Sequence, residues 1–231
     1  MYCTLTIVRF PKILAWAGFL SMAIFRLPLW LSKKNSFYKL MGCGKNGTFD
    51  KTPDLQQWAL LEVYSTNEYV QNNTPPFINW YWKFFKAEKL VMDLQAIESH
   101  GLWDKKYCFG DLPKQSNYEG TIAVLTRATI RLNKLSAFWK NVQPVAQQMN
   151  NVDGFITSFG IGEIPWIKQA TFSIWQSKES MKKFAYSMQT HKDVIIKKKK
   201  ENWYSEEMFT RFIVINCTGS LRGKNPLQIN P

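Results

Sequence analysis

Hydrophobic and polar positions follow two periods along the chain, and the order of these periods is repeated once. In the first half, runs with a period of two predict strands at Thr4 to Arg9, Phe37 to Gly44, Gln57 to Tyr64 and Leu90 to Glu98. Two helices are predicted between them: an apolar one from Pro11 to about Leu31, and one from Ser65 to about Phe85 that Thr74-Pro-Pro76 must bend or restart. The order is therefore strand, helix, strand, strand, helix, strand.

The second half has the same order. Strands are predicted at Thr121 to Arg131, Gly154 to Ile161, Lys168 to Trp175 and Phe209 to Cys217. Helices are predicted from Asn133 to about Met149 and, with Ser177 as N-cap, from there through the basic run Lys197 to Lys200. Residues match between the halves at offsets of 112 to 122, as in Arg9 with Arg131, Lys12 with Lys134, Gly42 with Gly160, Gln57 with Gln169 and Gly101 with Gly219.

Two βαββαβ units in tandem predict an α+β fold. Each unit places both helices on one face of an antiparallel sheet and leaves the other face to be covered. We therefore expect tandem ferredoxin-like repeats, at 1–110 and 119–231, that form a dimeric α+β barrel-type fold within one compact chain. A ligand in such a fold lies in the barrel or between a sheet and its helices.

The apolar run Ile13 to Leu31 is long enough to pass for a signal sequence or a membrane span. Arg26 and Pro28 interrupt it, and cleavage after Ala23 would remove the first strand and most of the first helix of one repeat. We therefore expect a helix buried in the fold of a cytoplasmic protein, with membrane attachment as the alternative.

Composition adds three constraints. The 231 residues are 45% hydrophobic, which indicates a globular chain, and 10 Trp with 16 Phe could line a pocket for a large apolar ligand or pack a core. The formal net charge of +13 favours anionic partners. Nucleic-acid binding would explain this charge and nothing else, so no specific nucleic acid is expected. The four cysteines are far apart, which argues against a disulfide framework or a zinc site.

Two histidines are candidates for an iron ligand. His191 continues the apolar stripe Phe184, Met188, Ile195 of the last helix, and a buried imidazole in an aromatic-rich cavity is the usual protein ligand of haem iron. The alternative is a core histidine whose ring nitrogens are satisfied by backbone. His100, in a turn-like setting before Gly101, is the fallback ligand, and Cys217 ranks below both histidines.

Arg127 and Arg131 lie on one face of their predicted strand, and either could pair with a haem propionate or form a structural salt bridge. The basic run Lys197 to Lys200 is either a solvated helix end or a docking site for an acidic electron donor or anionic lipid. Gly160-x-Gly162 is not a dinucleotide motif, because position 165 is proline and a strand follows. No residue could be assigned as catalytic from these patterns.

Several segments together are similar to the spheroidene monooxygenase family. They are Leu125 to Arg131, Phe138-Trp139, Phe159 to Pro165, Gln169 to Trp175, Phe184 to Tyr186, and His191 through Trp203-Tyr-Ser-Glu-Glu207 to Arg211-Phe212, with Met41 to Gly44 and Ser99 to Trp103 in the first half. The resemblance implies a haem-dependent monooxygenase that uses O2 and electrons from reduced ferredoxin to ketolate acyclic carotenoids at C2. It also places His191 at the family's helix histidine. The alternative is a non-catalytic α+β barrel protein that binds haem or an apolar ligand.

Overall fold

The computed structural model describes the chain except for residues 46–50, 67–72, 150, 188–196, 198–199 and 228–231. Its first half comprises β1 (Tyr2–Arg9), α1 (Ala15–Ile24), α2 (Arg26–Leu31), β2 (Phe37–Gly44), β3 (Pro53–Tyr64), α3 (Pro76–Phe84) and β4 (Glu88–Gly101). Its second half comprises β5 (Ile122–Ile130), α4 (Leu135–Met149), β6 (Phe155–Ile164), β7 (Lys168–Trp175), α5 (Lys178–Ser187) and β8 (Tyr204–Gly219).

The strands close into one antiparallel barrel in the order β1-β3-β2-β6-β7-β5-β8-β4. Each half contributes four consecutive strands in the ferredoxin-like order, β4-β1-β3-β2 as the first sheet and β8-β5-β7-β6 as the second. The two sheets join where β2 pairs with β6 and β4 with β8. The expected α+β barrel within one chain is confirmed. The repeat boundaries at 1–110 and 119–231 stay a prediction.

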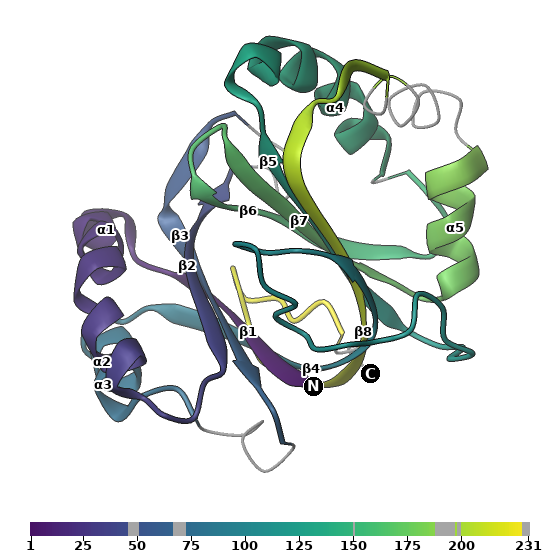
Figure 1. Cartoon of the computed structure of the whole chain (residues 1–231). Coiled ribbons are helices and arrows are strands. Elements are labelled where there is room, and N and C mark those ends of the chain that lie inside the picture. Colours follow the sequence, from purple (N-terminus) through teal and green to yellow (C-terminus); the bar gives the residue numbers. More distant parts are fainter. Residues whose placement is uncertain (46–50, 67–72, 150, 188–196, 198–199, 228–231) are drawn as a thin grey trace.

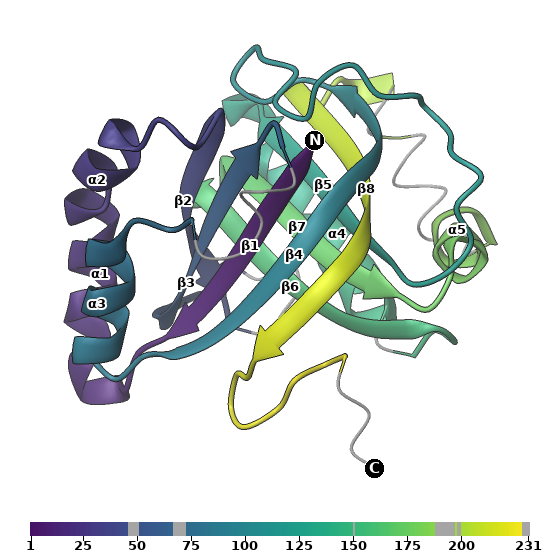
Figure 2. The ribbon, with the colours of Figure 1, turned by 90° about the horizontal axis from the view of Figure 1, so that it is seen from below.

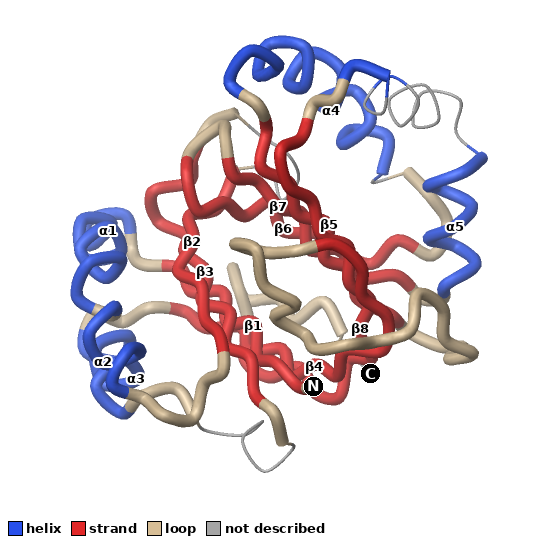
Figure 3. The backbone as a smooth tube through the Cα atoms, viewed as in Figure 1, coloured by secondary structure: helices blue, strands red, loops and turns tan. Residues whose placement is uncertain are grey.

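The barrel interior is the main core, and all helices described lie outside it (Figures 1 and 3). Inward-facing side chains from both sheets meet there with Trp103 and Phe109, which the connection after β4 contributes. Burying a side chain of this size stabilises the fold by about 2 kcal/mol. Separate apolar clusters fill parts of the space between the outer face of the first sheet and α1 to α3, and parts of the space between the second sheet and α4 and α5.

The two repeats correspond most clearly at the end of their last strands. Gly101 and Gly219 both have a positive φ, 84° and 79°, and a Cβ at either position would lie about 2 Å from a backbone oxygen of the neighbouring strand. Their predicted match is confirmed. The match of Arg9 with Arg131 is shifted by two residues: Arg9 faces Glu88 as Thr129 faces Glu206, so Arg9 corresponds to Thr129. The same register contradicts two other predicted matches, because Gly160 corresponds to Leu40 and not to Gly42, and Gln57 corresponds to Lys168 and not to Gln169.

The helices differ in detail from the predictions. The first predicted helix consists of a 3-10 turn (Lys12–Leu14) followed by α1 and α2, which meet at Phe25. The second is confirmed from Pro76 onward, where the proline occupies the first turn; part of the predicted stretch before it lies outside the described residues. Ser177 is an N-cap as predicted, since its Oγ accepts a hydrogen bond from the Ser180 backbone N at 3.1 Å.

The N-terminal helix was expected to be buried, but only one of its sides is. The segment Lys12–Leu31 has a mean hydropathy of 1.6 and is long and apolar enough to cross a membrane, but 28% of its apolar window is buried. On the buried side α1 packs closely on β3, because a Cβ at Gly18 would lie 2.2 Å from Trp58 Nε1. The other side is exposed.

Candidate functional site

The outer face of the second sheet carries a row of small residues at its centre. Thr126 of β5 pairs with Thr171 of β7, which pairs in turn with Gly160 of β6. Because side chains alternate between the faces of a strand, these positions face away from the interior, where the adjacent Leu125 and Phe172 are buried. Thr126 is exposed although it lies in the middle of its strand. Thr126 is therefore an exposed position in the row, between the buried Thr171 and the buried residues that flank it along β5.

Thr171 adds a polar feature to this row. Its Oγ1 atom is buried and has no hydrogen-bond partner in the described part of the chain. A buried hydroxyl without a partner costs about 1–3 kcal/mol of stability. Its presence at this position is consistent with a ligand that supplies the missing hydrogen bond.

Two apolar clusters flank the row. One, beside α5, contains Ile122, Trp175, Met181 and Phe184, with the rings of Trp175 and Phe184 stacked at 5.4 Å. The other, beside α4, contains Ile130, Phe138, Trp139 and Trp203. We call the space over Thr126, Gly160 and Thr171, between these clusters, the second-repeat gap. It combines apolar walls with a floor of small residues.

The first repeat has larger apolar residues at two of the equivalent positions. The corresponding row of the first sheet is Thr6 of β1, Leu60 of β3 and Leu40 of β2. Leu60 is buried in the cluster beneath α1 to α3, and Leu40 packs against it. Leucines thus stand where the second repeat has Thr171 and Gly160.

A buried group of charges lies on the outer side of the second sheet, near the second-repeat gap. Arg211 of β8 and Lys178 of α5 both form ion pairs with Glu98 of β4, and the backbone N of Ser116 donates to Glu98 at 2.8 Å. Burial raises the pKa of Glu98, but the hydrogen bonds from Lys178 and Ser116 outweigh it and hold this pKa below its usual range. Two cations thus share one carboxylate, and Arg211 Nε is buried without a partner among the described residues.

Arg127 lies on the other face of β5, inside one end of the barrel. It is 1% exposed, forms an ion pair with Glu206, and approaches Glu163 at 3.4 Å and Asp104 at 3.7 Å. Lys39 and Lys168 complete this cluster of three cations and three carboxylates. Burial raises the pKa of Asp104, but hydrogen bonds from both lysines lower it overall to about 2. The cluster is balanced in charge and closes the barrel end over Trp103.

The other predicted site residues are dispersed. Arg131 is exposed and follows the end of β5. His191 lies outside the described residues. His100 is exposed on β4, and its ring stacks on Phe209 with centroids 5.2 Å apart. Burial raises the pKa of Cys217 to about 11, so this group is a thiol at neutral pH and a poor candidate for a thiolate ligand. The structure does not bring these residues together with Arg127.

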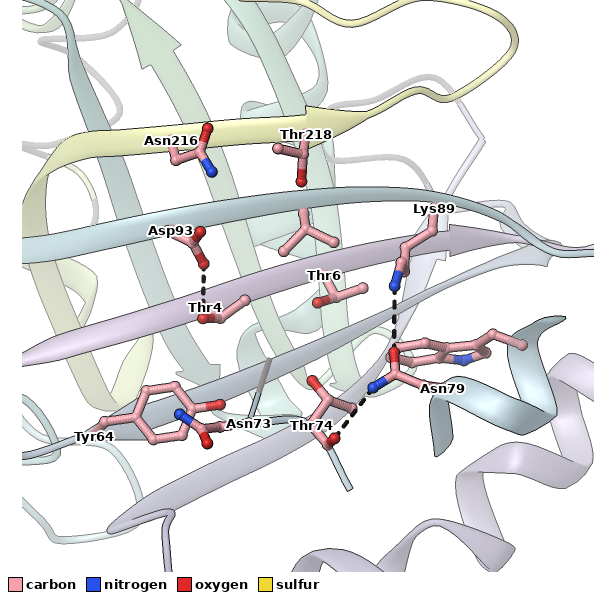
Figure 4. A pocket seen from close by; sticks show the side chains of 12 residues that line it. Thr4, Thr6, Tyr64, Asn73, Thr74, Asn79, Lys89, Asp93, Asn216 and Thr218 are labelled. Atoms are coloured by element: carbon pink, nitrogen blue, oxygen red, sulfur yellow. Dashed lines mark hydrogen bonds between the residues drawn. The ribbon is translucent and has the colours of Figure 1, made fainter. Parts of the chain in front are cut away.

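A polar cavity of about 270 Å³ lies on the outer face of the first sheet, beside α3 (Figure 4). At one end Thr4 donates to Asp93 at 3.1 Å, and at the other Lys89 Nζ donates to Asn79 at 3.2 Å. Trp82 Nε1, which is buried without a partner among the described residues, belongs to the same lining. This cavity suits a small hydrogen-bonding molecule and not a long apolar one.

A larger cavity of about 750 Å³ follows the first half of β6. Its lining includes Ser158 on the outer face of the second sheet, Phe159 on the inner face, and Leu221 from the turn after β8. The cavity therefore borders both sides of this strand.

Comparisons with known proteins identify relatives along most of the chain. The spheroidene monooxygenase of Rhodobacter capsulatus is 33% identical over 210 residues, which cover 89% of this chain and 86% of that protein. The spheroidene monooxygenase of Cereibacter sphaeroides is 30% identical, with 97% and 70% covered. The chain belongs to the spheroidene monooxygenase family. It is therefore a monooxygenase, as the resemblance implied. No protein-family model matches this member of the family.

Solved structures support the fold alone. Two structures of aldoxime dehydratase, one of them in complex with butyraldoxime, match this monooxygenase with TM-scores of 0.58 and 0.60 at 10% identity. The matches cover 92% and 93% of this chain and 80% and 79% of theirs.

The sequence patterns missed two features of this family member. Arg211 lies in a matching segment, but the sequence gives it no role, because its partner Glu98 is 113 positions away. The row Thr126, Thr171, Gly160 depends on strand register. An unusual run of small outward-facing residues in β5 and β7 was the available clue, since such positions normally carry residues that pack against helices.

Proposed function

We propose that this monooxygenase is haem-dependent and inserts oxygen from O2 into an acyclic carotenoid, of the spheroidene to spheroidenone type at C2, with electrons from reduced ferredoxin. The curated relatives, named spheroidene monooxygenases, support the reaction class. We place the haem in the second-repeat gap. The observation that carries this placement is the row of small residues, with exposed Thr126 at its centre, between two apolar clusters.

The chemistry of the residues around the gap supports a haem at this place. Gly160 and Thr171 would allow a flat macrocycle to approach the sheet, Trp175 and Trp139 would bound it, and the unpartnered Thr171 hydroxyl would face it. His191 is the proposed axial ligand, which the resemblance implies, with His100 as the fallback. Bound haem would supply the activation of dioxygen.

We assign the haem carboxylates to Arg211 and Lys178. These two cations share the single carboxylate of Glu98 and lie on the outer side of the second sheet, where α5 packs. Arg127 would serve this role only for a haem inside the barrel, because it faces the interior and already contacts three carboxylates. Arg131 stays a second candidate at the α4 side of the gap.

The chain's own groups would also orient the other reactants. The cavity along β6 borders the second sheet and offers a route for a long polyene, with Phe159 and Leu221 as apolar contacts. Lys182 and Lys183 on α5 are exposed, as are Lys197 and Lys200, and these cations would dock an acidic ferredoxin.

The first test is the visible absorption spectrum of protein produced with ample haem, compared with two variants at equivalent positions. Thr126→Phe fills the second-repeat gap, whereas Thr6→Phe places the same ring on the first sheet, beside the polar cavity. We expect a stoichiometric Soret band in the wild type and in Thr6→Phe, and at least a roughly tenfold loss of haem affinity in Thr126→Phe, because the ring removes space that the macrocycle needs.

The same spectra test the ligand. His191→Ala should lose or shift the Soret band and His100→Ala should keep it; loaded protein with reduced ferredoxin should then convert spheroidene to its C2 ketone. A wild type that stays colourless after haem titration would overturn the proposal. Haem binding that Thr126→Phe leaves unchanged would place the haem outside the gap.

A further inference from the structure

The helices of the first repeat expose an unusual number of large apolar side chains. We call this surface the aromatic face and define it by Trp16, Phe19, Leu27, Trp30, Trp80 and Phe84, each more than half exposed. They come from α1, α2 and α3, which lie side by side as a layer over the first sheet (Figure 2). This layer is on a different side of the barrel from α4 and α5 (Figure 3).

The aromatic face is ordered by its own contacts. The rings of Trp80 and Phe84 stack at 5.2 Å, and Trp16 meets Phe85 edge to face at 5.5 Å. Beneath it the helices are packed tightly, since Tyr81 on the buried side donates a hydrogen bond to the Ala17 backbone oxygen at 2.9 Å. Isolated exposed apolar residues are ordinary, but a contiguous patch on a rigid layer marks an interaction site.

The charge of this layer indicates the partner. The sequence contains no Asp or Glu at positions 10–49 or 73–87, the two stretches that hold the three helices. The same stretches expose basic side chains around the apolar ones: Lys12, Arg26, Lys33, Lys34, Lys83 and Lys86. Helices that lie in the surface of an anionic bilayer have this composition: they carry Trp and Phe bordered by Lys and Arg, without acidic residues.

We propose that the aromatic face docks the protein onto an anionic lipid bilayer, with α1 to α3 lying in the plane of the membrane surface. A second copy fits this face poorly, because a symmetric contact would bring its basic residues against one another. A membrane span is also disfavoured, since Lys12–Leu31 would have to leave the packing of Gly18 on Trp58 and of Phe25 and Leu29 in the core beneath it. This inference does not depend on haem or on the reaction proposed above.

Flotation with vesicles tests the proposal. The full chain is mixed with vesicles of phosphatidylcholine alone or with about one third phosphatidylglycerol, and the bound fraction is measured at low and high salt. We expect binding to the anionic vesicles that weakens several-fold in high salt. The pair Trp30→Ser with Phe84→Ser should lower the partition coefficient at least roughly tenfold, because it removes two apolar anchors.

Matched variants separate binding through the aromatic face from non-specific adsorption to vesicles. Tyr107→Ser is the control, since Tyr107 and Trp30 are both 72% exposed but Tyr107 lies outside the aromatic face, and it should bind like the wild type. The charge variant Lys33→Glu with Lys34→Glu should bind several-fold more weakly. Absence of wild-type binding to anionic vesicles would overturn the proposal. So would a lipid-free dimer in sedimentation velocity that Trp30→Ser with Phe84→Ser dissociates, because the face would then join two copies.

Discussion

The two repeats share a fold but use their helix layers in opposite ways. In the first repeat the central row carries Leu60 and Leu40, which pack beneath the helices, and large apolar side chains are also exposed on the outside of the helices. In the second repeat the central row is Thr171 and Gly160, and the exposed side of α5 carries Lys182 and Lys183. The two layers therefore differ in the size of the residues at the centre of the sheet beneath them and in the character of their exposed side, which is apolar in the first repeat and basic on α5 in the second.

This difference shows how a duplicated unit can divide two tasks. A haem or another large flat group needs space beneath a helix layer, which costs packing energy. The closed barrel lets one half omit that packing while the other half and the shared interior keep the fold stable. The three predictions below test this division, from the largest expected change in stability to the smallest.

The largest effect is expected at Glu98, the buried carboxylate of the charge cluster on the second sheet. Glu98→Gln leaves the buried Arg211 and the partly buried Lys178 without a counter-charge, and breaking a buried ion pair in this way costs about 3–5 kcal/mol. Urea unfolding at neutral pH measures the loss of unfolding free energy. Restoring balance with Lys178→Met in the same chain should recover part of it. A loss below about 1 kcal/mol would mean that the cluster is open to solvent.

The second prediction concerns Glu62, a buried carboxylate in the first repeat that accepts hydrogen bonds from neutral side chains. Thr74 donates to it at 2.7 Å and Asn35 at 3.3 Å, and burial, partly offset by these hydrogen bonds and one from Tyr64, raises its pKa to about 7. The folded protein therefore binds this proton more tightly than the unfolded chain. Its contribution is complete below pH 4.5 and is lost as pH rises through 7, which amounts to about 3 kcal/mol.

Glu62→Gln should flatten this part of the pH profile and make the protein more stable than wild type at pH 8. Some slope should remain, because burial also raises the pKa of Asp93 on β4. The exposed Glu179→Gln serves as the control and should keep the wild-type profile. Equal slopes for Glu62→Gln and wild type between pH 5 and pH 8 would contradict the assignment.

Much of the fold follows from the sequence because its strands are short, amphipathic and duplicated. The run Lys168 to Trp175 was predicted with the bounds that β7 has, since aromatic and β-branched residues alternate there with small polar ones. The shifted match of Arg9 shows the limit: identity of two arginines carries less information than the cross-strand register, which places Arg9 opposite Glu88. Register is a property of pairs of strands and is invisible along one of them.

The candidate site was predicted less well for the same reason. Period-two alternation placed Arg127 on one face of β5, but which face is inside depends on how the barrel closes. Once closed, it turns Arg127 toward Glu163 and Glu206 and leaves Arg211 on the side of α5. The partner of Arg211, Glu98, comes from β4 in the other repeat, so no local pattern could have indicated it.

The smallest change in stability, and the most diagnostic one, is expected for Thr171→Leu. This variant places a leucine at the position of the second repeat that corresponds to Leu60 in the first. The change removes an unpartnered buried hydroxyl and fills part of the gap, so the unfolding free energy of the haem-free protein should rise by about 1 kcal/mol. The same change should weaken haem binding roughly tenfold, because the added methyl groups occupy the floor of the gap. Thermal unfolding of haem-free protein and haem titration measure the two effects separately. A higher unfolding free energy together with weaker haem binding would show that Thr171 lowers the stability of the protein and favours a ligand at this position. A variant that loses stability would mean that Thr171 already has its partner within the protein, and the second repeat would then be as closely packed as the first.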